Sequence, residues 1–182
     1  MAQSTRGGEP LSPDGGKLGV LKFTWQADRY HHHWEFDAAE PSIASVESTS
    51  ADAWPISPPL QQIHQQSFAD GRQVVFGVGM AGRGHWSASF TLIPDLHCWI
   101  VELACRSPQE PDHLASTYQL SGDWQEQGEQ GIAGSHLNQR LTVQPIAPGS
   151  LADLESNVLV IRPSSLADVA TTHQWAFRLR IA

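Results

Sequence analysis

The chain has 182 residues, of which 40% are hydrophobic and 16% are charged, and this is enough apolar material for one folded core. Its formal charge of −8, from 19 acidic and 11 basic residues, argues against a nucleic acid or an anionic membrane as the main partner, because both are themselves negatively charged. No apolar run approaches the roughly 18 residues that a membrane-spanning helix needs, so we expect neither nucleic-acid nor membrane binding.

The N-terminal residues 1–16 are polar and show no charged-then-apolar signal pattern. We therefore expect a flexible arm there, followed by a single all-β domain over residues 17–182. Both cysteines, Cys98 and Cys105, fall in one expected strand, where seven residues separate them by about 23 Å, too far for a disulfide bond. Free thiols and the lack of an export signal predict a cytoplasmic protein.

Apolar and polar residues alternate with a period of two along most of the chain, which is typical of strands that bury one face. Strands are expected over residues 18–25, 30–36, 60–68, 72–80, 85–93, 97–105, 117–120, 136–144, 157–162 and 173–181. The Ala-, Ser- and Pro-rich stretch 37–59 is interpreted as a long connection with room for a short strand near 43–46. The Ser-Leu-Ala-Asp sequences at 150–153 and 165–168 each match a helix start and predict single helical turns.

The turns between the strands predict how neighbouring strands pair. Four turns are placed from the sequence, at Ala27-Asp28, Asp70-Gly71, Gly82-Arg83-Gly84 and Asp95-Leu96. The second is taken as a two-residue turn and the third as a three-residue loop that ends in a left-handed residue. In the same order, the four turns set Trp25 opposite Tyr30, His64 opposite Gly77, Val78 opposite Ala88, and Phe90 opposite Val101.

These pairings place the apolar residues of four consecutive strands on one face of a meander, which is the expected result when register follows the hydrophobic pattern. Further strands must cover that face. We therefore predict an all-β fold, an antiparallel β-sandwich or β-barrel of about nine to ten strands built on this meander, with only short helical turns.

The sequence Gly77-x-Gly79-x-x-Gly82 matches a dinucleotide-binding fingerprint, which requires a following helix whose N-terminus meets the pyrophosphate. The residues that follow alternate as in a strand. We interpret these glycines as hairpin residues and expect no cofactor.

The polar face of the meander is the main candidate for function. The predicted register aligns four residues in one row across the four strands: His64, Gly77, Ser89 and Glu102. Gly79 and Ser87 lie in the neighbouring row. Glycine inside a strand often marks the close approach of a ligand or of another backbone. We predict a ligand- or partner-binding surface at these six residues, and a homodimer joined through this face is one form that such binding can take.

Two enzymatic alternatives remain open. His64, Ser89 and Glu102 contain the groups of a hydrolase, with Ser89 as nucleophile and His64 as base, although the register places Glu102 beside Ser89 and away from His64. His31, His33 and Glu35 alternate on one strand face, as a two-histidine, one-carboxylate metal site requires. The predicted pairing also sets Lys22 opposite His33, and a cation there opposes metal binding.

Seven tryptophans allow a third alternative, a barrel with an internal apolar ligand pocket. Five of them fall on predicted core faces, whereas Trp54 and Trp124 lie in loops, where they either plug one end of the fold or stack on a ligand. The preferred function from the sequence is a non-catalytic ligand- or partner-binding module. The alternatives are a small acid–base or metal-assisted hydrolase-like enzyme and the ligand-binding barrel.

Overall fold

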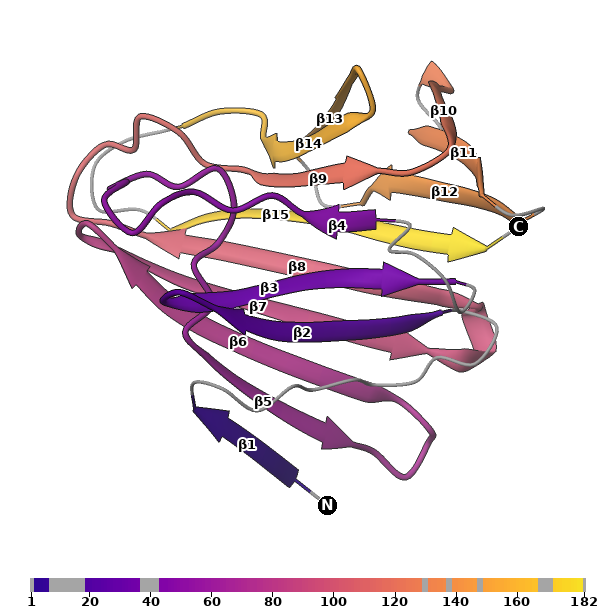
Figure 1. Ribbon diagram of the computed structural model, residues 1–182, viewed down its shortest axis with the longest axis horizontal. Helices are drawn as coiled ribbons and strands as arrows, with labels where there is room; N and C mark the ends of the chain where they lie inside the picture. The colour runs from indigo at the N-terminus through magenta and orange to yellow at the C-terminus, as the bar shows by residue number, and fades with distance from the viewer. Residues whose placement is uncertain are drawn as a thin grey trace.

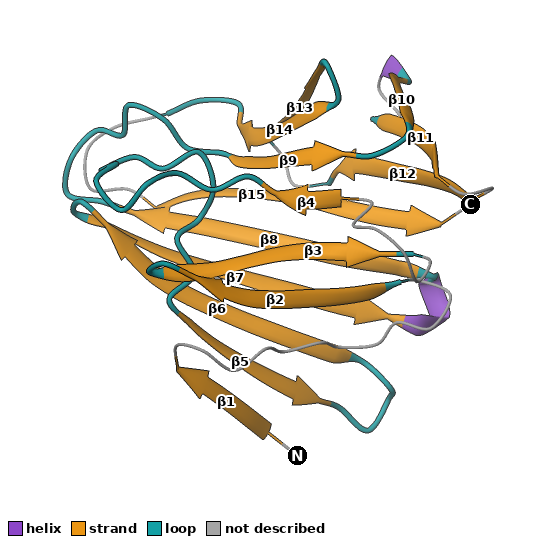
Figure 2. Cartoon of the chain, in the orientation of Figure 1, coloured by secondary structure: helices purple, strands orange, loops and turns teal. Residues whose placement is uncertain are grey.

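The computed structural model describes residues 2–6, 19–36, 43–128, 131–136, 139–146, 149–166 and 172–181. Two antiparallel sheets pack face to face as a sandwich (Figures 1 and 2). The two sheets are separate, which confirms the predicted all-β fold and decides for the sandwich over the barrel. Among the described residues no helix is long and apolar enough to cross a membrane, and a 3-10 turn at Pro94–Leu96 joins two strands.

The larger sheet has nine strands, and the predicted meander forms β5 to β8 within it. In spatial order the strands are β1 (Ala2–Arg6), β5 (Gln62–Ser67), β6 (Gln73–Ala81), β7 (Gly84–Ile93), β8 (Cys98–Arg106), β15 (Thr172–Ile181), β12 (Gln139–Pro145), β11 (Ile132–His136) and β10 (Asp123–Glu126). The six-stranded sheet has the order β13 (Ser150–Glu155), β14 (Val158–Pro163), β9 (Ser116–Leu120), β4 (Ile43–Ser45), β3 (Arg29–Glu35) and β2 (Val20–Gln26).

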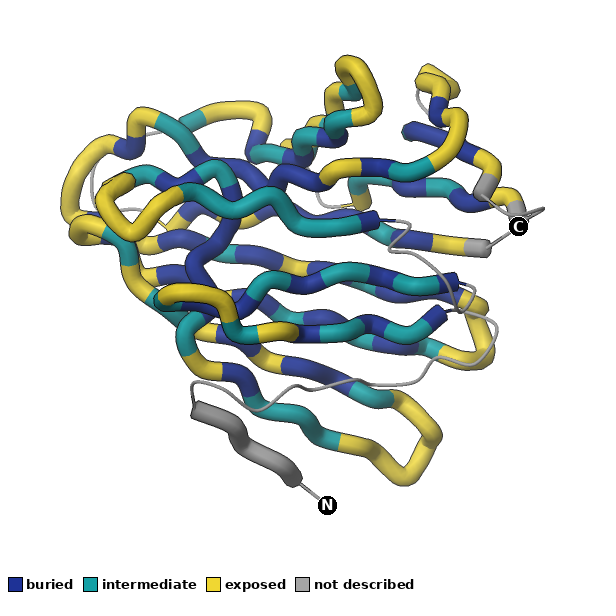
Figure 3. Tube along the Cα trace, viewed as in Figure 1, coloured by how far each residue is buried: buried dark blue, intermediate teal, exposed yellow. Residues whose placement is uncertain are grey.

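The core lies between the two sheets, and buried and exposed positions alternate along most strands (Figure 3). Four of the five tryptophans predicted on core faces are fully buried, namely Trp34, Trp86, Trp99 and Trp175, and Trp25 packs against the core. Trp34 and Trp99 come from opposite sheets and meet edge to face with ring centroids 6.5 Å apart. Aromatic contacts of this kind join the two layers.

Trp54 and Trp124 also pack against the core, and Trp124 lies in strand β10, paired with Gly134 of β11, instead of in the predicted loop. Trp124 covers Gly134, where an added Cβ would lie 2.2 Å from the indole ring, and its Nε1–H donates to the carbonyl of Ser121 at 2.9 Å. These contacts favour the interpretation of the two residues as plugs.

Two of the predicted registers are confirmed. Trp25 lies opposite Tyr30 in the first hairpin, and Phe90 lies opposite Val101 between β7 and β8. The short strand expected near residues 43–46 is present as β4.

Strand β6 is paired one residue away from the predicted register on both of its sides. His64 lies opposite Phe76 instead of Gly77, and Val78 lies opposite Ser87 instead of Ala88. The two errors cancel at β7, so β5, β7 and β8 present the predicted faces and β6 alone is inverted.

The cause of both errors lies in the turns. The first loop has three residues, Ala69-Asp70-Gly71, because Phe68 and Arg72 already pair through a 2.8 Å hydrogen bond, and Gly71 takes the left-handed conformation at φ +83°. The second turn has only two residues, Gly82 and Arg83, and Gly82 has φ +55°, as a type II′ turn requires at its first central position.

Two further differences concern residues that were not predicted as strands. Residues 150–153, predicted as a helical turn, belong to strand β13, because they pair with β14 in a hairpin. Residues 167 and 168 of the second such prediction lie outside the described residues. Ala2–Arg6, within the predicted arm, pair with β5 as strand β1, while the division of the chain at residue 17 stays a prediction.

Candidate functional site

The two strand glycines lie on the inner face of β6, where the segment just before β5 crosses the strand. The N–H of Gln61 donates to the carbonyl of Val78 at 2.8 Å, and Leu60 is fully buried over Gly77. A Cβ added at Gly79 would lie 1.6 Å from the carbonyl oxygen of Pro59. The glycines therefore mark a close backbone approach, as the sequence predicted, but the approaching backbone belongs to the same chain.

The inversion of β6 turns three large apolar side chains to solvent. Phe76 is 41% exposed, Val78 47% and Met80 50%, and all three project from the outer face of the nine-stranded sheet. We call these three residues the β6 ridge. Because Leu60 and the 59–61 backbone occupy the inner face of β6, the core is filled without them.

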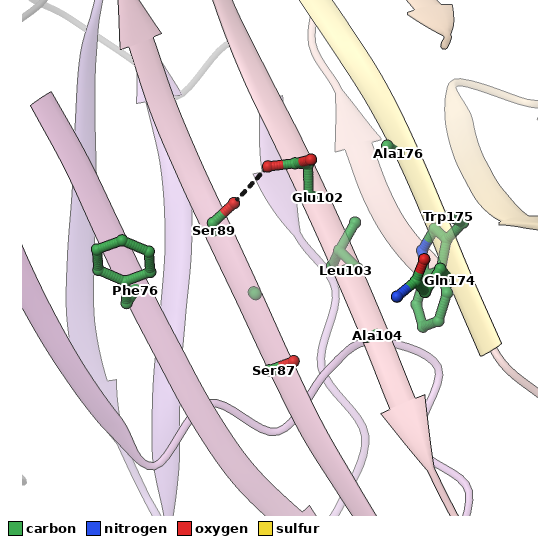
Figure 4. Close-up of a pocket in the computed structure, with 10 residues that line it drawn as sticks. Phe76, Ser87, Ser89, Glu102, Leu103, Ala104, Gln174, Trp175 and Ala176 are labelled. Carbon is green, nitrogen blue, oxygen red and sulfur yellow. Dashed lines mark hydrogen bonds between the residues drawn. The ribbon is translucent and has the colours of Figure 1, made fainter. Parts of the chain in front are cut away.

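A shallow groove with a volume of about 340 Å³ lies beside the ridge, over β7, β8 and β15. Its floor is made by small side chains that we call the trough: Ser87, Ser89, Ala104 and Ala176. Figure 4 shows Phe76 on one side of this groove and Gln174 on the other, with Glu102 between them. The outer face therefore consists of a raised apolar strand next to a depression with a mixed lining.

Ser89 and Glu102 are brought together as predicted. They lie opposite each other on β7 and β8, and the Ser89 hydroxyl donates to Glu102 Oε2 at 3.0 Å (Figure 4). His64 is in the same row but on the far side of Phe76, about 10 Å from Ser89 between Cα atoms, which is two strand spacings. A serine nucleophile needs its base next to the hydroxyl, and here Phe76 takes that position.

The candidate metal ligands His31, His33 and Glu35 share one face of β3, with Lys22 opposite His33 as predicted. Glu35 already has two partners, because Lys22 Nζ lies 2.5 Å from Oε2 and His33 Nε2 lies 3.0 Å from Oε1. The hydrogen bond from Lys22 is the main cause that lowers the pKa of Glu35. Within the described part of the chain, no group of three or more His, Cys, Asp or Glu side chains is placed to hold a metal ion.

A group of polar side chains that sequence reasoning missed lies buried near the six-stranded sheet. His32 is buried, with Nε2 3.2 Å from the Tyr118 hydroxyl, and burial lowers the pKa of His32 to about 3. Burial also raises the pKa of Glu47 to about 7, although the Ser45 hydroxyl and the Arg29 guanidinium oppose this change. Both shifts favour the uncharged form of the side chain in the fold.

One sequence signal could have indicated Glu47. Glu47 lies four residues after Ile43, which is buried in the short strand β4. In an extended chain every second side chain points to the same side, so Glu47 points to the same side as Ile43 if the chain stays extended. Its place in a polar connection suggested a solvated acid instead.

A second hollow region lies where β10 of one sheet comes near β13 of the other. Two depressions of about 440 and 660 Å³ share Glu126 and Asp153 in their lining. Arg162 Nε lies 2.9 Å from Asp153 Oδ2, so this acid is already paired. Exposed acids and a free strand edge characterise this region, whereas the outer face of the larger sheet is mainly uncharged.

No protein-family model matches this chain, and no curated protein is similar to it at a significant level. The site therefore has to be interpreted from its own geometry.

Proposed function

We propose that the protein is a non-catalytic binding module whose binding surface is the outer face of the nine-stranded sheet, formed by the β6 ridge and the trough. The observation that carries this proposal is the outward position of Phe76, Val78 and Met80 on a strand whose inner face is filled by other residues. Neighbouring large apolar side chains exposed together are typical of an interaction site.

The composition of the surface supports binding. Each exposed apolar side chain leaves area in water that a partner can cover, at about 25 cal/mol per Å². Ser89, Glu102 and Gln174 beside the ridge add hydrogen-bonding groups, and an apolar surface with a few polar groups is common in ligand sites.

The same geometry disfavours the two enzymatic alternatives. Ser89 donates its hydroxyl proton to Glu102, and Phe76 separates it from His64. At the other candidate site the Glu35 carboxylate is held by Lys22. Neither site offers the pairing of groups that its reaction needs.

We retain the reducing cytoplasm as the proposed location. Cys98 and Cys105 are buried and unpaired, which supports it.

Fragment binding followed by amide NMR tests the binding surface. With indole, benzamide and methyl glucoside as probes, we expect the shift changes of at least one probe to cluster at Ser87–Ser89 and Glu102–Ala104. The substitution Ser87→Leu fills the groove and should remove those changes. Shift changes confined to the region of Glu126 and Asp153, or the absence of changes on the outer face, would contradict the proposal.

A further inference from the structure

We infer that the β6 ridge and the trough are the two halves of one self-complementary interface, through which two copies of this chain pair about a two-fold axis. This inference rests on the proposed function and names its partner, a second copy of the same protein.

The outer face of the nine-stranded sheet has a raised part next to a hollow part. The ridge places three large side chains in a row on β6, and the trough places four small ones on the next strands, β7, β8 and β15. In a two-fold dimer both copies use the same patch, so each patch must contain a feature and its complement. A ridge beside a trough meets that requirement.

The strand order gives the axis. A two-fold axis midway between β6 and β7, parallel to the strands, superposes β6 of one copy on β7 of the other, and β5 on β8, because the strands of each pair are equally far from that axis. Val78 of one copy then lies above Ser87 of the other, and Phe76 lies above Ser89, since these residues are directly paired in the sheet. Sheets packed face to face are about 10 Å apart, which is the distance that interdigitating side chains fill.

The charges on this surface favour pairing between like molecules. Among the described residues that point outward from β5 to β8 and from β15, Glu102 is the single acid, and the basic residues are Arg106, Arg178 and Arg180. The whole chain carries 19 acids and a net charge of −8. Two copies therefore repel each other less through this face than through a typical part of their surface.

The single acid has candidate partners in such a dimer. Ser89 already donates to Glu102 within each copy. The axis between β6 and β7 sets His64 of the second copy above Glu102, because the two residues lie in one row, on either side of the Phe76–Ser89 pair. His64 is thus placed to donate the second hydrogen bond that a buried carboxylate requires.

The size of the face sets the expected strength. Five strands about 4.8 Å apart and about seven residues of 3.3 Å each give a flat area on the order of 500 Å². Standard interfaces bury about 800 Å² on each partner, so this face lies at the small end, and we expect a weak dimer.

Sedimentation velocity of the full chain between about 1 and several hundred micromolar tests the inference. The wild type should pass from monomer to dimer over this range. Val78→Ser, which removes part of the ridge, and Ser87→Leu, which fills the trough, should each weaken the dimer about tenfold or more. Leu151→Ser is the matched control, because Leu151 is 40% exposed on β13, away from this face, and should leave the Kd unchanged.

A mixture of the two variants separates ridge-into-trough packing from other dimers. In a heterodimer of Val78→Ser with Ser87→Leu, one contact joins an intact ridge to an intact trough, and the other joins the small serine to the large leucine. The mixture should therefore dimerise more tightly than either variant alone.

A monomer at all concentrations would overturn the inference, as would a dimer that responds to Leu151→Ser but not to the ridge and trough variants, or a mixture no tighter than its components. In those cases the fragment experiment decides separately whether the outer face binds another ligand, so the proposed binding function can survive the loss of the dimer.

Discussion

Two regions of this protein reverse the usual distribution of side chains. On the outer face of the nine-stranded sheet, the large apolar residues of the β6 ridge are exposed. Near the six-stranded sheet, the ionisable residue His32 is buried, and Glu47 is half-buried with its carboxyl oxygens out of contact with solvent. Each region costs free energy, the first by leaving apolar area in water and the second by removing polar groups from it.

The difference between the regions lies in how each cost is met. In the buried group the cost is only partly met inside the molecule. His32 Nε2 contacts the Tyr118 hydroxyl and both ionisable groups shift their pKa toward the neutral form, whereas His32 Nδ1 and both carboxyl oxygens of Glu47 have no hydrogen-bond partner among the described residues. The cost of exposing the ridge is not met within the described residues of the chain, because these residues leave about half of the surface of Val78 and of Met80 exposed to solvent. We therefore assign the ridge, whose cost a partner can remove, to binding.

The largest effect is expected for Gly79→Ala, which disturbs the close contact between β6 and the backbone that crosses it. The new Cβ would lie 1.6 Å from the Pro59 carbonyl oxygen, so the crossing backbone has to move. We expect a loss of more than about 3 kcal/mol in the free energy of unfolding, measured by chemical denaturation.

Gly77→Ala is the control for that substitution. Its Cβ meets the Leu60 side chain at 3.0 Å, and a side chain can adjust where a backbone cannot. A smaller loss is expected, about 1–2 kcal/mol, and equal losses at the two glycines would argue against a fixed backbone crossing.

Glu47→Gln tests the buried region through its pH dependence. Because burial raises the pKa of Glu47 from 4.5 to about 7, the folded state retains a proton that the unfolded state loses. The contribution of Glu47 to the free energy of unfolding therefore falls as pH rises from about 4.5 to 7, by roughly 3 kcal/mol in total. Denaturation of both proteins across this range should show their difference change by that amount, and a constant difference would mean that Glu47 is solvated.

His32→Gln should show the opposite slope. Burial lowers the pKa of His32 from 6.5 to about 3. Between these two pH values the unfolded state binds a proton at His32 and the folded state does not. The wild type should therefore lose stability relative to the variant as pH falls below 6.5, by about 2.5 kcal/mol at pH 4.5. If the two proteins kept a constant difference, His32 would have to be protonated in the fold.

Much of the fold follows from the sequence, because strand alternation and turn residues act locally. The β2–β3 hairpin and the β7–β8 pairing were predicted with the correct register, and so was Ser89 opposite Glu102. Residues 150–153 were assigned to a helical turn because Ser-x-x-Asp is a local helix signal, and the contact with β14 that makes them a strand is a tertiary one.

The orientation of β6 shows where local reasoning ends. Its alternate positions are Val75, Gly77 and Gly79 on one face and the ridge on the other, so hydrophobicity places the ridge inside. Leu60 reverses that choice by supplying, from another segment, the apolar volume that the glycines lack. Such a contact has no signature in the sequence of β6 itself, apart from the glycines that allow it.

The central claim, that β6 turns its large apolar residues outward, is tested most directly by comparing Val75→Ala with Val78→Ala. The two residues are of one type on one strand, yet Val75 is 1% exposed and Val78 is 47% exposed. At low protein concentration, where no dimer forms, we expect Val75→Ala to lower the free energy of unfolding by about 2 kcal/mol and Val78→Ala to change it by less than about 0.5 kcal/mol. The reverse ranking would place Val78 in the core, restore the register that the turns alone predict, and remove the ridge on which the proposed binding surface depends.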